Sequence, residues 1–260
     1  MDLGLRDRVC VVTGASQGIG LETSRRLAEE GATVVMVARD AERLEAAAEP
    51  LDAHWVAVDV TDADADVRIV STCAEQLGGI DVLVNNAGTS RNIPLPELTD
   101  DDWRFQLDLH VMACVRLMRA AAPRMARQGW GRIVNVSSSS GKRPSQSNVA
   151  YSVAKAAQLS ASRAFADAYA ARGVLVNAVT PGVVGTGLWL EDGGLGDQAA
   201  AAKGITRDEA VAEAAAKIPL GRIGEPREIA DVIAFLCSER ASNVTGAAWS
   251  ADGGSVNIIV

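Results

Sequence analysis

Short apolar runs alternate along the chain with longer stretches in which apolar residues recur every three or four positions. The short runs are rich in β-branched residues, as in buried strands, and the longer stretches have the periodicity of amphipathic helices. Strands are predicted over Arg8–Thr13, Ala32–Ala38, His54–Val58, Ile80–Val84, Arg132–Val136, Val174–Val179 and Ala247–Ser250. Helices are predicted over Leu21–Gly31, Ala41–Glu49, Asp64–Leu77, Thr99–Arg127, Tyr151 to about Arg172, and Pro226–Cys237.

This alternation defines the expected fold. Parallel strands need long crossover connections, which helices supply, and the helices then cover both faces of the sheet. The fold class is therefore α/β, a Rossmann-type doubly wound parallel sheet of about seven strands that binds ligands beyond the carboxyl ends of its strands. No internal repeat or low-complexity linker divides the chain, so residues 1–260 are expected to form one domain.

Residues 183–220 break the rhythm of strands and helices. Short alanine-rich helical stretches are separated there by Gly185, Gly187, Gly193, Gly194, Gly196 and Gly204. A glycine-punctuated insertion beyond the carboxyl end of a strand is typical of a mobile segment that covers a site. We expect this segment to be a substrate lid, in which Leu188 and Trp189 either contact substrate or pack on the sheet.

The long helix predicted over Thr99–Arg127 has two features of its own. Pro123 has no backbone N–H and predicts an irregularity at that point. The acidic run Thr99–Asp102 contains possible metal ligands, but an N-cap threonine followed by carboxylates at the positive end of a helix explains it. No metal site is predicted.

Composition narrows the class of partner. Of the 260 residues, 48% are hydrophobic and 22% charged, as in an ordinary soluble domain. The formal net charge of −8 and an aromatic content of 4% argue against nucleic acid and an anionic membrane surface as partners.

The cysteines and the first residues indicate the compartment. The cysteines are widely spaced within apolar segments, which favours buried thiols under reducing conditions, at Cys10, Cys73, Cys114 and Cys237. No signal peptide is visible, and no apolar run approaches the roughly 18 residues needed to cross a bilayer. We expect a cytoplasmic protein.

A glycine-rich turn follows the first strand. Its glycines, Gly14, Gly18 and Gly20, are spaced differently from the G-x-G-x-x-G dinucleotide fingerprint. The order of strand, turn and helix nevertheless aims backbone N–H groups at a phosphate. Small or polar residues also follow the later strands, and their recurrence at one edge of one sheet fits an extended ligand better than chance turns. These clusters are Asp59-Val60, Asn86-Ala87-Gly88, Ser137–Ser140 and Pro181-Gly182.

Tyr151 and Lys155 lie four residues apart in a predicted helix and should share one of its faces. A neighbouring ammonium group favours phenolate and lowers the tyrosine pKa from its usual value of about 10, which makes the pair usable for proton transfer. The same spacing occurs in many helices, so the pair by itself proves little.

Together these motifs carry a family resemblance over essentially the whole chain. The sequence resembles the short-chain dehydrogenase/reductase family, and most broadly the branch that includes 3-oxoacyl-[acyl-carrier-protein] reductases. The motifs occur in the family's order and spacing, and they are Thr13-Gly14-x-x-x-Gly18-x-Gly20, Asn85-Asn86-Ala87-Gly88, Ser138, Tyr151-x-x-x-Lys155, and Pro181-Gly182 with Thr186.

The resemblance implies an oxidoreductase that interconverts a ketone and a secondary alcohol by hydride transfer with a nicotinamide cofactor. It implies Tyr151 as general acid/base, Lys155 as the group that lowers the pKa of Tyr151 and holds the nicotinamide ribose, and Ser138 as the ligand of the substrate oxygen. It also implies a cofactor site made by Gly14, Ser16, Gln17, Gly18, Ile19, Gly20, Arg39, Asp59, Val60, Asn86, Ala87, Gly88, Tyr151, Lys155, Pro181, Gly182, Val184 and Thr186.

At one position the chain departs from the family. The helix before the fifth strand usually supplies an asparagine that helps to hold a water in the proton relay from the lysine, and His110 stands in its place. The histidine is either structural or a replacement in the relay, since an imidazole can hydrogen-bond water. Because imidazole titrates at about pH 6.5, we hypothesise that turnover depends on pH through His110. The other histidine, His54, is expected to be structural.

Residues at the end of the second strand bear on the choice of cofactor. An acidic side chain there would bind the adenosine 2′-hydroxyl and repel a 2′-phosphate. The chain has Ala38 followed by Arg39, whose guanidinium suits phosphate, and this favours NADP(H). Asp40 is adjacent, and Gln17 stands where NADP-using relatives often have a basic residue, so NAD(H) stays possible.

The substrate stays open at this point. One alternative is a 3-oxoacyl-[acyl-carrier-protein] reductase of fatty-acid synthesis, which would need a local basic patch for its acidic carrier; Arg124, Arg127, Arg132, Lys142 and Arg143 are the candidates. A second alternative is a non-catalytic cofactor-binding regulator on the same fold. Such a regulator would have no need of Ser138, Tyr151 and Lys155 together.

The resemblance also implies an assembly. Family members are commonly homotetramers that pair the helices equivalent to Thr99–Arg127 and Ser152–Arg172, and we expect a homotetramer here. The C-terminal segment Asn257–Val260 ends in three apolar residues, which fit a further subunit contact.

Overall fold

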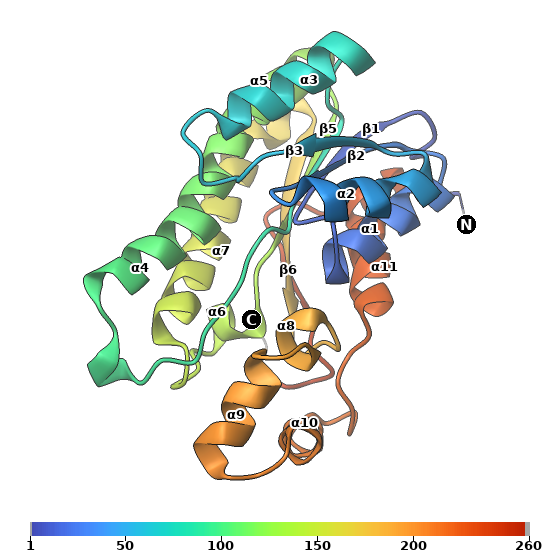
Figure 1. The fold of residues 1–260 in the computed structure, drawn as a ribbon. Coiled ribbons are helices and arrows are strands. Elements are labelled where there is room, and N and C mark those ends of the chain that lie inside the picture. The colour runs from blue at the N-terminus through green and yellow to red at the C-terminus, as the bar shows by residue number, and fades with distance from the viewer. Residues whose placement is uncertain (1, 258–260) are drawn as a thin grey trace.

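Seven strands form one sheet in which every neighbouring pair is parallel (Figure 1). The computed structural model describes residues 2–257, so the contact expected of residues 258–260 lies outside the described part. The strand order is β3-β2-β1-β4-β5-β6-β7. The strands are β1 (Val9–Thr13), β2 (Thr33–Ala38), β3 (His54–Ala57), β4 (Val82–Asn85), β5 (Gly131–Val136), β6 (Val174–Pro181) and β7 (Ala248–Ala251). The predicted doubly wound sheet is confirmed.

The strand order reverses between β1 and β4, which are hydrogen-bonded neighbours. The chain leaves β1 toward β2 on one side and leaves β4 toward β5 on the other. The connections therefore diverge at the carboxyl ends of these two strands and open a crevice there, as expected for a doubly wound sheet. The polar clusters that follow the strands all belong to this edge.

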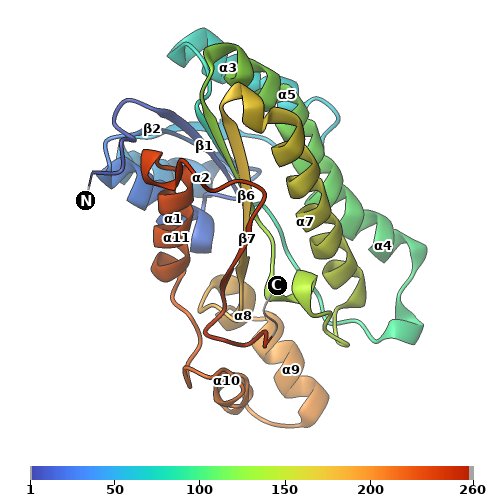
Figure 2. The ribbon, with the colours of Figure 1, turned by 180° about the vertical axis from the view of Figure 1, so that it is seen from behind.

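Helices cover both faces of the sheet (Figures 1 and 2). Helices α1, α2 and α11 pack on one face, while α3, α5 and α7 pack on the other. Side chains of β1 alternate between these layers, with Cys10 and Val12 in the first core and Val9 and Val11 in the second. The helices are α1 (Gly18–Glu29), α2 (Ala41–Ala48), α3 (Ala65–Leu77), α5 (Ala113–Gln128), α7 (Val149–Tyr169) and α11 (Pro226–Cys237).

The long helix predicted over Thr99–Arg127 is three consecutive elements. They are α4 (Asp100–Leu107), a π-helical turn η3 (Asp108–Met112) and α5. The predicted capping box is confirmed, because Thr99 and Asp102 cap each other's backbone N–H groups. The irregularity predicted at Pro123 is wrong, since α5 continues through Pro123. Buried Ala121, Ala122 and Met125 hold that part of the helix against the core, and the irregularity falls instead on the turn that contains His110.

The 183–220 segment lies beyond the carboxyl ends of the strands, in orange in Figure 1. It holds α8 (Gly187–Leu190), α9 (Leu195–Lys203) and α10 (Arg207–Ala216). Two backbone hydrogen bonds of 2.9 Å close its base, from Gly185 N to Gly224 O and from Gly224 N to Val183 O. The segment is therefore a small helical unit that is anchored at its root.

The remaining elements are short. They are η1 (Glu49–Leu51), η2 (Leu95–Glu97), α6 (Ser139–Lys142), η4 (Ala170–Arg172) and η5 (Glu239–Ala241). Among residues 2–257, no helix combines the length and the apolar character that a membrane crossing requires. Within the same residues, no three histidine, cysteine, aspartate or glutamate side chains gather closely enough to hold a metal ion.

Candidate active site

A cavity of about 1120 Å³ opens at the carboxyl edge of the sheet. The glycine turn, the ends of β2 to β6, helix α7 and the 183–220 segment all contribute to its wall. Nearly every residue predicted to bind cofactor or substrate lines this cavity. They are Gly14, Ser16, Gln17, Gly18, Ile19, Arg39, Asp59, Val60, Asn86, Ala87, Gly88, His110, Ser138, Tyr151, Lys155, Pro181, Gly182, Val184 and Thr186.

Gly20 is the exception. It faces the inside of the glycine turn, where an added Cβ would lie 2.2 Å from the carbonyl oxygen of Gly14. A side chain at position 20 would therefore push the helix away from the turn. Gly20 serves close packing of the turn rather than contact with a ligand.

The glycine turn presents an open helix N-terminus to the cavity. Gly14 and Gly18 have φ angles of 64° and 56°, which L-residues rarely adopt. Gln17, the N-cap of α1, makes no side-chain cap, and the first turn of α1 carries no acidic residue. Free N–H groups at a positive helix end bind anions. The turn thus fits the pyrophosphate of a dinucleotide cofactor.

Asn86 holds the turn in place. Its Nδ2 donates to the carbonyl oxygens of Thr13 and Gly14 at 2.9 and 3.2 Å. Thr13 Oγ1 in turn accepts from the backbone N–H groups of Asn86 and Ala87 at 2.9 and 3.0 Å. These bonds join β1 to β4 across the crevice, so Asn86 supports the cofactor site as well as lining it.

Two arginines lie where the adenosine ribose of a dinucleotide is expected. The Arg39 side chain is 79% exposed and is 3.8 Å from the Asp59 carboxylate. Asp40 does not oppose it directly, because its Oδ1 caps α2 by accepting from Arg43 N at 3.1 Å. Arg43 also lines the cavity and was not predicted from the sequence. The sequence signal that could have indicated Arg43 is its position four residues after Arg39, in the first turn of the helix that follows.

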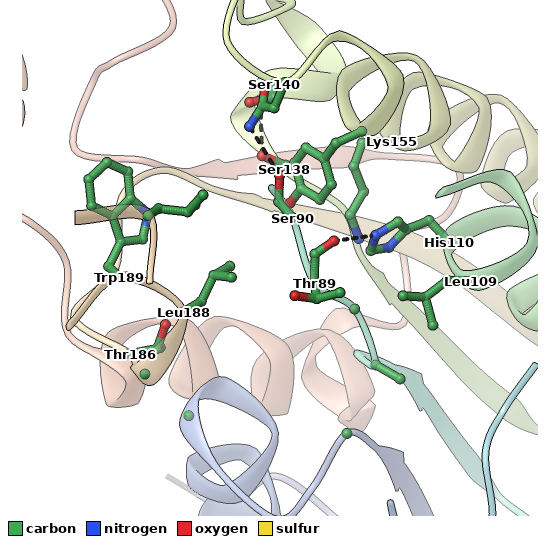
Figure 3. Close-up of a pocket in the computed structure, with 18 of the residues that line it drawn as sticks. Thr89, Ser90, Leu109, His110, Ser138, Ser140, Lys155, Thr186, Leu188 and Trp189 are labelled. Atoms are coloured by element: carbon green, nitrogen blue, oxygen red, sulfur yellow. Dashed lines mark hydrogen bonds between the residues drawn. The ribbon is translucent and has the colours of Figure 1, made fainter. Parts of the chain in front are cut away.

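Ser138, Tyr151 and Lys155 meet on one wall of the cavity. Ser138 Oγ accepts from Ser140 N at 3.1 Å, a bond that fixes the hydroxyl at the end of β5 (Figure 3). Lys155 Nζ lies 5.6 Å from the centre of the Tyr151 ring. The three groups predicted to perform proton transfer are thus brought together by β5 and α7.

The pKa values of the pair differ from the expectation. Burial raises the pKa of Tyr151, and the hydrogen bond with Ser138 opposes that rise only in part. Burial also lowers the pKa of Lys155 to about 7. The predicted lowering of the Tyr151 pKa by Lys155 is therefore not found.

Lys155 is held by two acceptors. Its Nζ donates to the Val136 carbonyl at 2.8 Å and to Gln158 Oε1 at 3.3 Å. Gln158 is buried and was not predicted. The signal was a polar stripe within the alanine-rich α7, since Ser152, Lys155, Gln158 and Ser162 recur at helical spacing and are all buried.

His110, in the π-helical turn, packs against Tyr151. The two rings are 5.1 Å apart in an edge-to-face arrangement. His110 Nε2 donates to the Thr89 carbonyl at 2.9 Å, which leaves Nδ1 as an acceptor (Figure 3). This buried Nδ1 has no partner within residues 2–257. Gly88 makes room for the ring, because an added Cβ there would lie 2.5 Å from its Cε1.

Burial, and then the neighbouring Lys155 charge, lower the pKa of His110 well below 6.5. The imidazole is therefore neutral at physiological pH. This contradicts the hypothesis that turnover titrates through His110 at about pH 6.5. The structure places a neutral imidazole at this position, with Nε2 hydrogen-bonded and Nδ1 without a partner among residues 2–257.

The 183–220 segment forms the wall opposite Ser138 and His110. Leu188 and Trp189 line the cavity and lie across it from Ser138 and His110 in Figure 3. Gln198 Oε1 accepts from Asn92 N at 2.9 Å, which ties α9 to the loop after β4. Neither Asn92 nor Gln198 was predicted, because their pairing joins two loops far apart in sequence.

The basic patch considered for a carrier protein does not assemble. Arg124 and Arg127 lie near the end of α5, which leads into the amino end of β5, away from the cavity. Arg132 is buried and faces Glu239. Lys142 donates to the Ala248 carbonyl at 2.7 Å. Arg124 and Arg127 thus precede β5 while Lys142 and Arg143 follow it, so the two pairs lie toward opposite ends of that strand.

The fold and this wall of hydroxyl, phenol and ammonium groups define a class of nicotinamide-dependent oxidoreductases. The chain belongs to the short-chain dehydrogenase/reductase family. A family model described as enoyl-(acyl carrier protein) reductase matches residues 14–256.

Curated and solved relatives agree with this assignment. The chain is 40% identical to a cis-4-hydroxycyclohexanecarboxylate dehydrogenase of Sinomonas cyclohexanicum, over 95% of this chain and 96% of that protein. It is 33% identical to a 3-oxoacyl-[acyl-carrier-protein] reductase of Aquifex aeolicus, over 98% and 99%. An L-sorbose reductase of Gluconobacter frateurii, solved with NADPH and L-sorbose, has a TM-score of 0.94 at 35% identity, and each chain is covered in full.

Proposed function

We propose that the protein interconverts a ketone and a secondary alcohol with NADP(H). The observation that carries the proposal is the convergence of Ser138, Tyr151 and Lys155 on one wall of a cavity whose other end is an anion-binding glycine turn. The cofactor supplies or accepts the hydride at the substrate carbon. The chain's own residues bind the substrate oxygen and move the proton.

In the reducing direction the substrate carbonyl oxygen accepts hydrogen bonds from Ser138 Oγ and Tyr151 Oη. As negative charge develops on this oxygen, Tyr151 transfers its proton to it, so that an alcohol and a phenolate result. Charged Lys155 stabilises that phenolate. Lys155 would also hold the ribose of a bound cofactor, and its Nζ is already positioned by Val136 O and Gln158.

His110 acts as a positioning residue in this proposal. Its Nε2–H anchors the π-helical turn to Thr89 O, and its free Nδ1 accepts from a water in the relay that reprotonates Lys155 and Tyr151. The imidazole would do this as a neutral acceptor, without titrating itself.

Preference for NADP(H) over NAD(H) rests on Arg39 and Arg43. Both line the cavity, and Asp40 is occupied as a helix cap. Their present ion pairs, with Asp59 at 3.8 Å and Glu191 at 3.4 Å, are loose enough for a 2′-phosphate to compete for both guanidinium groups. The NADPH bound to the similar L-sorbose reductase supports the same choice. A higher kcat/KM with NADPH than with NADH is expected, and the reverse order would sink this preference.

The decisive experiment follows NADPH oxidation with a panel of small ketones in native protein and in Tyr151→Phe. Loss of the phenol should reduce kcat by about 10³-fold, since general acid catalysis contributes roughly 10²- to 10⁴-fold. Cofactor binding, measured by fluorescence titration, should be retained. If native protein binds NADPH but turns over no ketone or alcohol, the protein is a cofactor-binding regulator and the proposal fails.

A reductase acting on acyl-carrier thioesters is a second candidate, favoured by the 33% identity to a 3-oxoacyl-[acyl-carrier-protein] reductase. The dispersed arginines give it no support from the surface. A free thioester such as acetoacetyl-coenzyme A, assayed beside the ketone panel, separates the two.

We also propose the homotetramer expected of the family. Exposed apolar side chains on the outer faces of α4, η3 and α7 support it, at Phe105, Leu107, Met112 and Val153. Sedimentation that gives the mass of one chain would remove this proposal.

A further inference from the structure

A second, smaller cavity adjoins the active site. It has a volume of about 220 Å³ and lies between α4, the loop after β4 and the start of α7. Tyr151, Ser90 and Asn148 line both cavities, so the smaller one is a side chamber of the substrate site. The volume suits a handful of non-hydrogen atoms beyond the reacting carbonyl.

The wall of this side chamber contains an unsatisfied buried amide. Gln106 is 7% exposed, lines the chamber, and its Oε1 has no hydrogen-bond partner within residues 2–257. A buried polar group without a partner costs about 1–3 kcal/mol. Position 106 lies one helical turn before His110, whose ring packs against Tyr151. An amide can turn end over end, so it can offer the chamber either its oxygen or its NH₂.

Arg91 is the charged group that distinguishes the chamber. It lines the side chamber and not the main cavity, and within residues 2–257 it makes neither an ion pair nor a side-chain hydrogen bond. The cations of the main cavity other than Lys155 are paired instead, with Arg39 near Asp59, Arg43 near Glu191 and Lys203 near Glu213.

One carboxylate, Asp102, also lines the chamber. Its Oδ2 accepts from Thr99 N at 3.0 Å and from Thr99 Oγ1 at 2.6 Å as part of the capping box of α4. Hydrogen bonds from Thr99, and then the charge of Arg91, lower the pKa of Asp102. The Asp102 carboxylate is therefore engaged in the helix cap, and the N–H groups of Arg91 can donate to another acceptor.

We propose that the side chamber binds a carboxylate of the substrate, so that the natural substrate is a keto acid or hydroxy acid. Arg91 and the Gln106 amide bind the carboxylate, while Ile93, Leu98 and Phe105 cover the carbon skeleton between it and the reacting carbon. This inference rests on the proposed ketone–alcohol function and specifies its substrate class. An arginine fork suits a carboxylate in geometry as well as in charge.

The test compares matched substrates that differ only in the anionic group. We would measure kcat/KM with NADP⁺ for cis-4-hydroxycyclohexanecarboxylate and its carboxamide, and with NADPH for 4-oxopentanoate and its amide. Native protein should prefer the carboxylate of each pair by at least about tenfold, as expected for one charge-assisted contact. Two carbon skeletons separate the effect of charge from the effect of shape.

Variants assign that preference to the chamber. Arg91→Gln should reduce the acid-to-amide ratio to about one, Arg91→Lys should keep part of it, and Gln106→Leu should lower it by a few-fold, since each removes or retains a donor to the carboxylate. Arg91 is exposed, so its replacement does not threaten folding. Arg124→Gln, on the far end of α5, is the matched control and should leave the ratio unchanged.

The outcomes separate this inference from the proposed function. Turnover that depends on Tyr151, with an acid-to-amide ratio at or below one for both skeletons, overturns the carboxylate and leaves the function standing. An acid preference that survives Arg91→Gln also overturns the assignment to the chamber. Absence of any Tyr151-dependent turnover removes the proposed function, and this inference with it.

Discussion

The two walls of the active-site cavity are built on different principles. On the wall made by β5, η3 and α7, Ser138, Lys155 and His110 are buried, and each is held by a backbone group, namely Ser140 N, Val136 O and Thr89 O. On the wall made by the 183–220 segment, the ion pairs are mostly exposed, and the Asn92–Gln198 and Arg43–Glu191 contacts join the segment to the rest of the site. Buried bonds hold geometry, while exposed pairs contribute little and are screened by salt.

We infer from this difference that the helical wall carries out the reaction and that the 183–220 wall selects the substrate. Proton transfer needs atoms fixed within tenths of an ångström, and a packed helix supplies that precision. Substrate choice tolerates movement, and a segment that must open for entry cannot be buried on all sides. Substitutions on the helical wall should therefore change the rate and its pH dependence, and substitutions on the 183–220 wall should change mainly KM.

Replacing Lys155 should give the largest effect on the helical wall. In Lys155→Met no ammonium stabilises the phenolate of Tyr151, so kcat should fall by about 10²- to 10⁴-fold. A Lys155→Arg variant keeps the charge and controls for it. Steady-state kinetics with a ketone accepted by the native protein measure both, and a loss of less than tenfold in Lys155→Met would contradict the role.

The same substitution has a stability signature with a defined sign. The folded-state pKa of Lys155 is about 7, below its ordinary value of 10.5, so folding costs most below pH 7, where the buried amine must be charged. Between those two values the unfolded state binds more protons, and native stability rises with pH. Methionine removes this dependence. Lys155→Met should therefore compare most favourably with native protein at about pH 6 and less favourably at about pH 9, as chemical denaturation can measure.

Apolar periodicity and the motifs at strand ends were sufficient for the sheet and the order of elements, and the family resemblance supplied most of the residues around the large cavity. Prediction from the sequence failed where the outcome depends on three-dimensional packing. The break in the long helix falls on the turn that contains His110, whose imidazole binds Thr89 O across the fold, while α5 continues through Pro123. Gln106, Gln158 and Arg43 were missed because their partners or cavities lie across the fold.

His110 offers a smaller test of the helical wall. His110→Ala leaves Thr89 O without its donor and opens a cavity beside Tyr151, so kcat should fall by about tenfold. His110→Asn can still donate to Thr89 O and should stay within about threefold of native protein. Because the pKa of His110 is held well below 6.5, the pH profiles of native protein and His110→Asn should coincide from about pH 6 to 8. If the pH profile of native protein shows a titration near pH 6.5 that is absent in His110→Asn, the hypothesis that turnover depends on pH through His110 would be correct.

The 183–220 wall should respond least, and in KM. Gln198 Oε1 accepts from Asn92 N, and Gln198 Nε2 donates to the Gly193 carbonyl at 2.9 Å. One amide therefore links α9 both to the loop after β4 and to the residues just before α9. Gln198→Ala removes about 1 kcal/mol of hydrogen bonding from the closed arrangement, equivalent to about a fivefold rise in KM. The value of kcat should change by less than about twofold, because the proton-transfer groups are anchored elsewhere.

Gln76→Ala, on the exposed face of α3, is the matched control and should change neither constant. A fall in kcat larger than the rise in KM would mean that closure of this segment helps to align the reacting groups, and the division between the two walls would then be wrong.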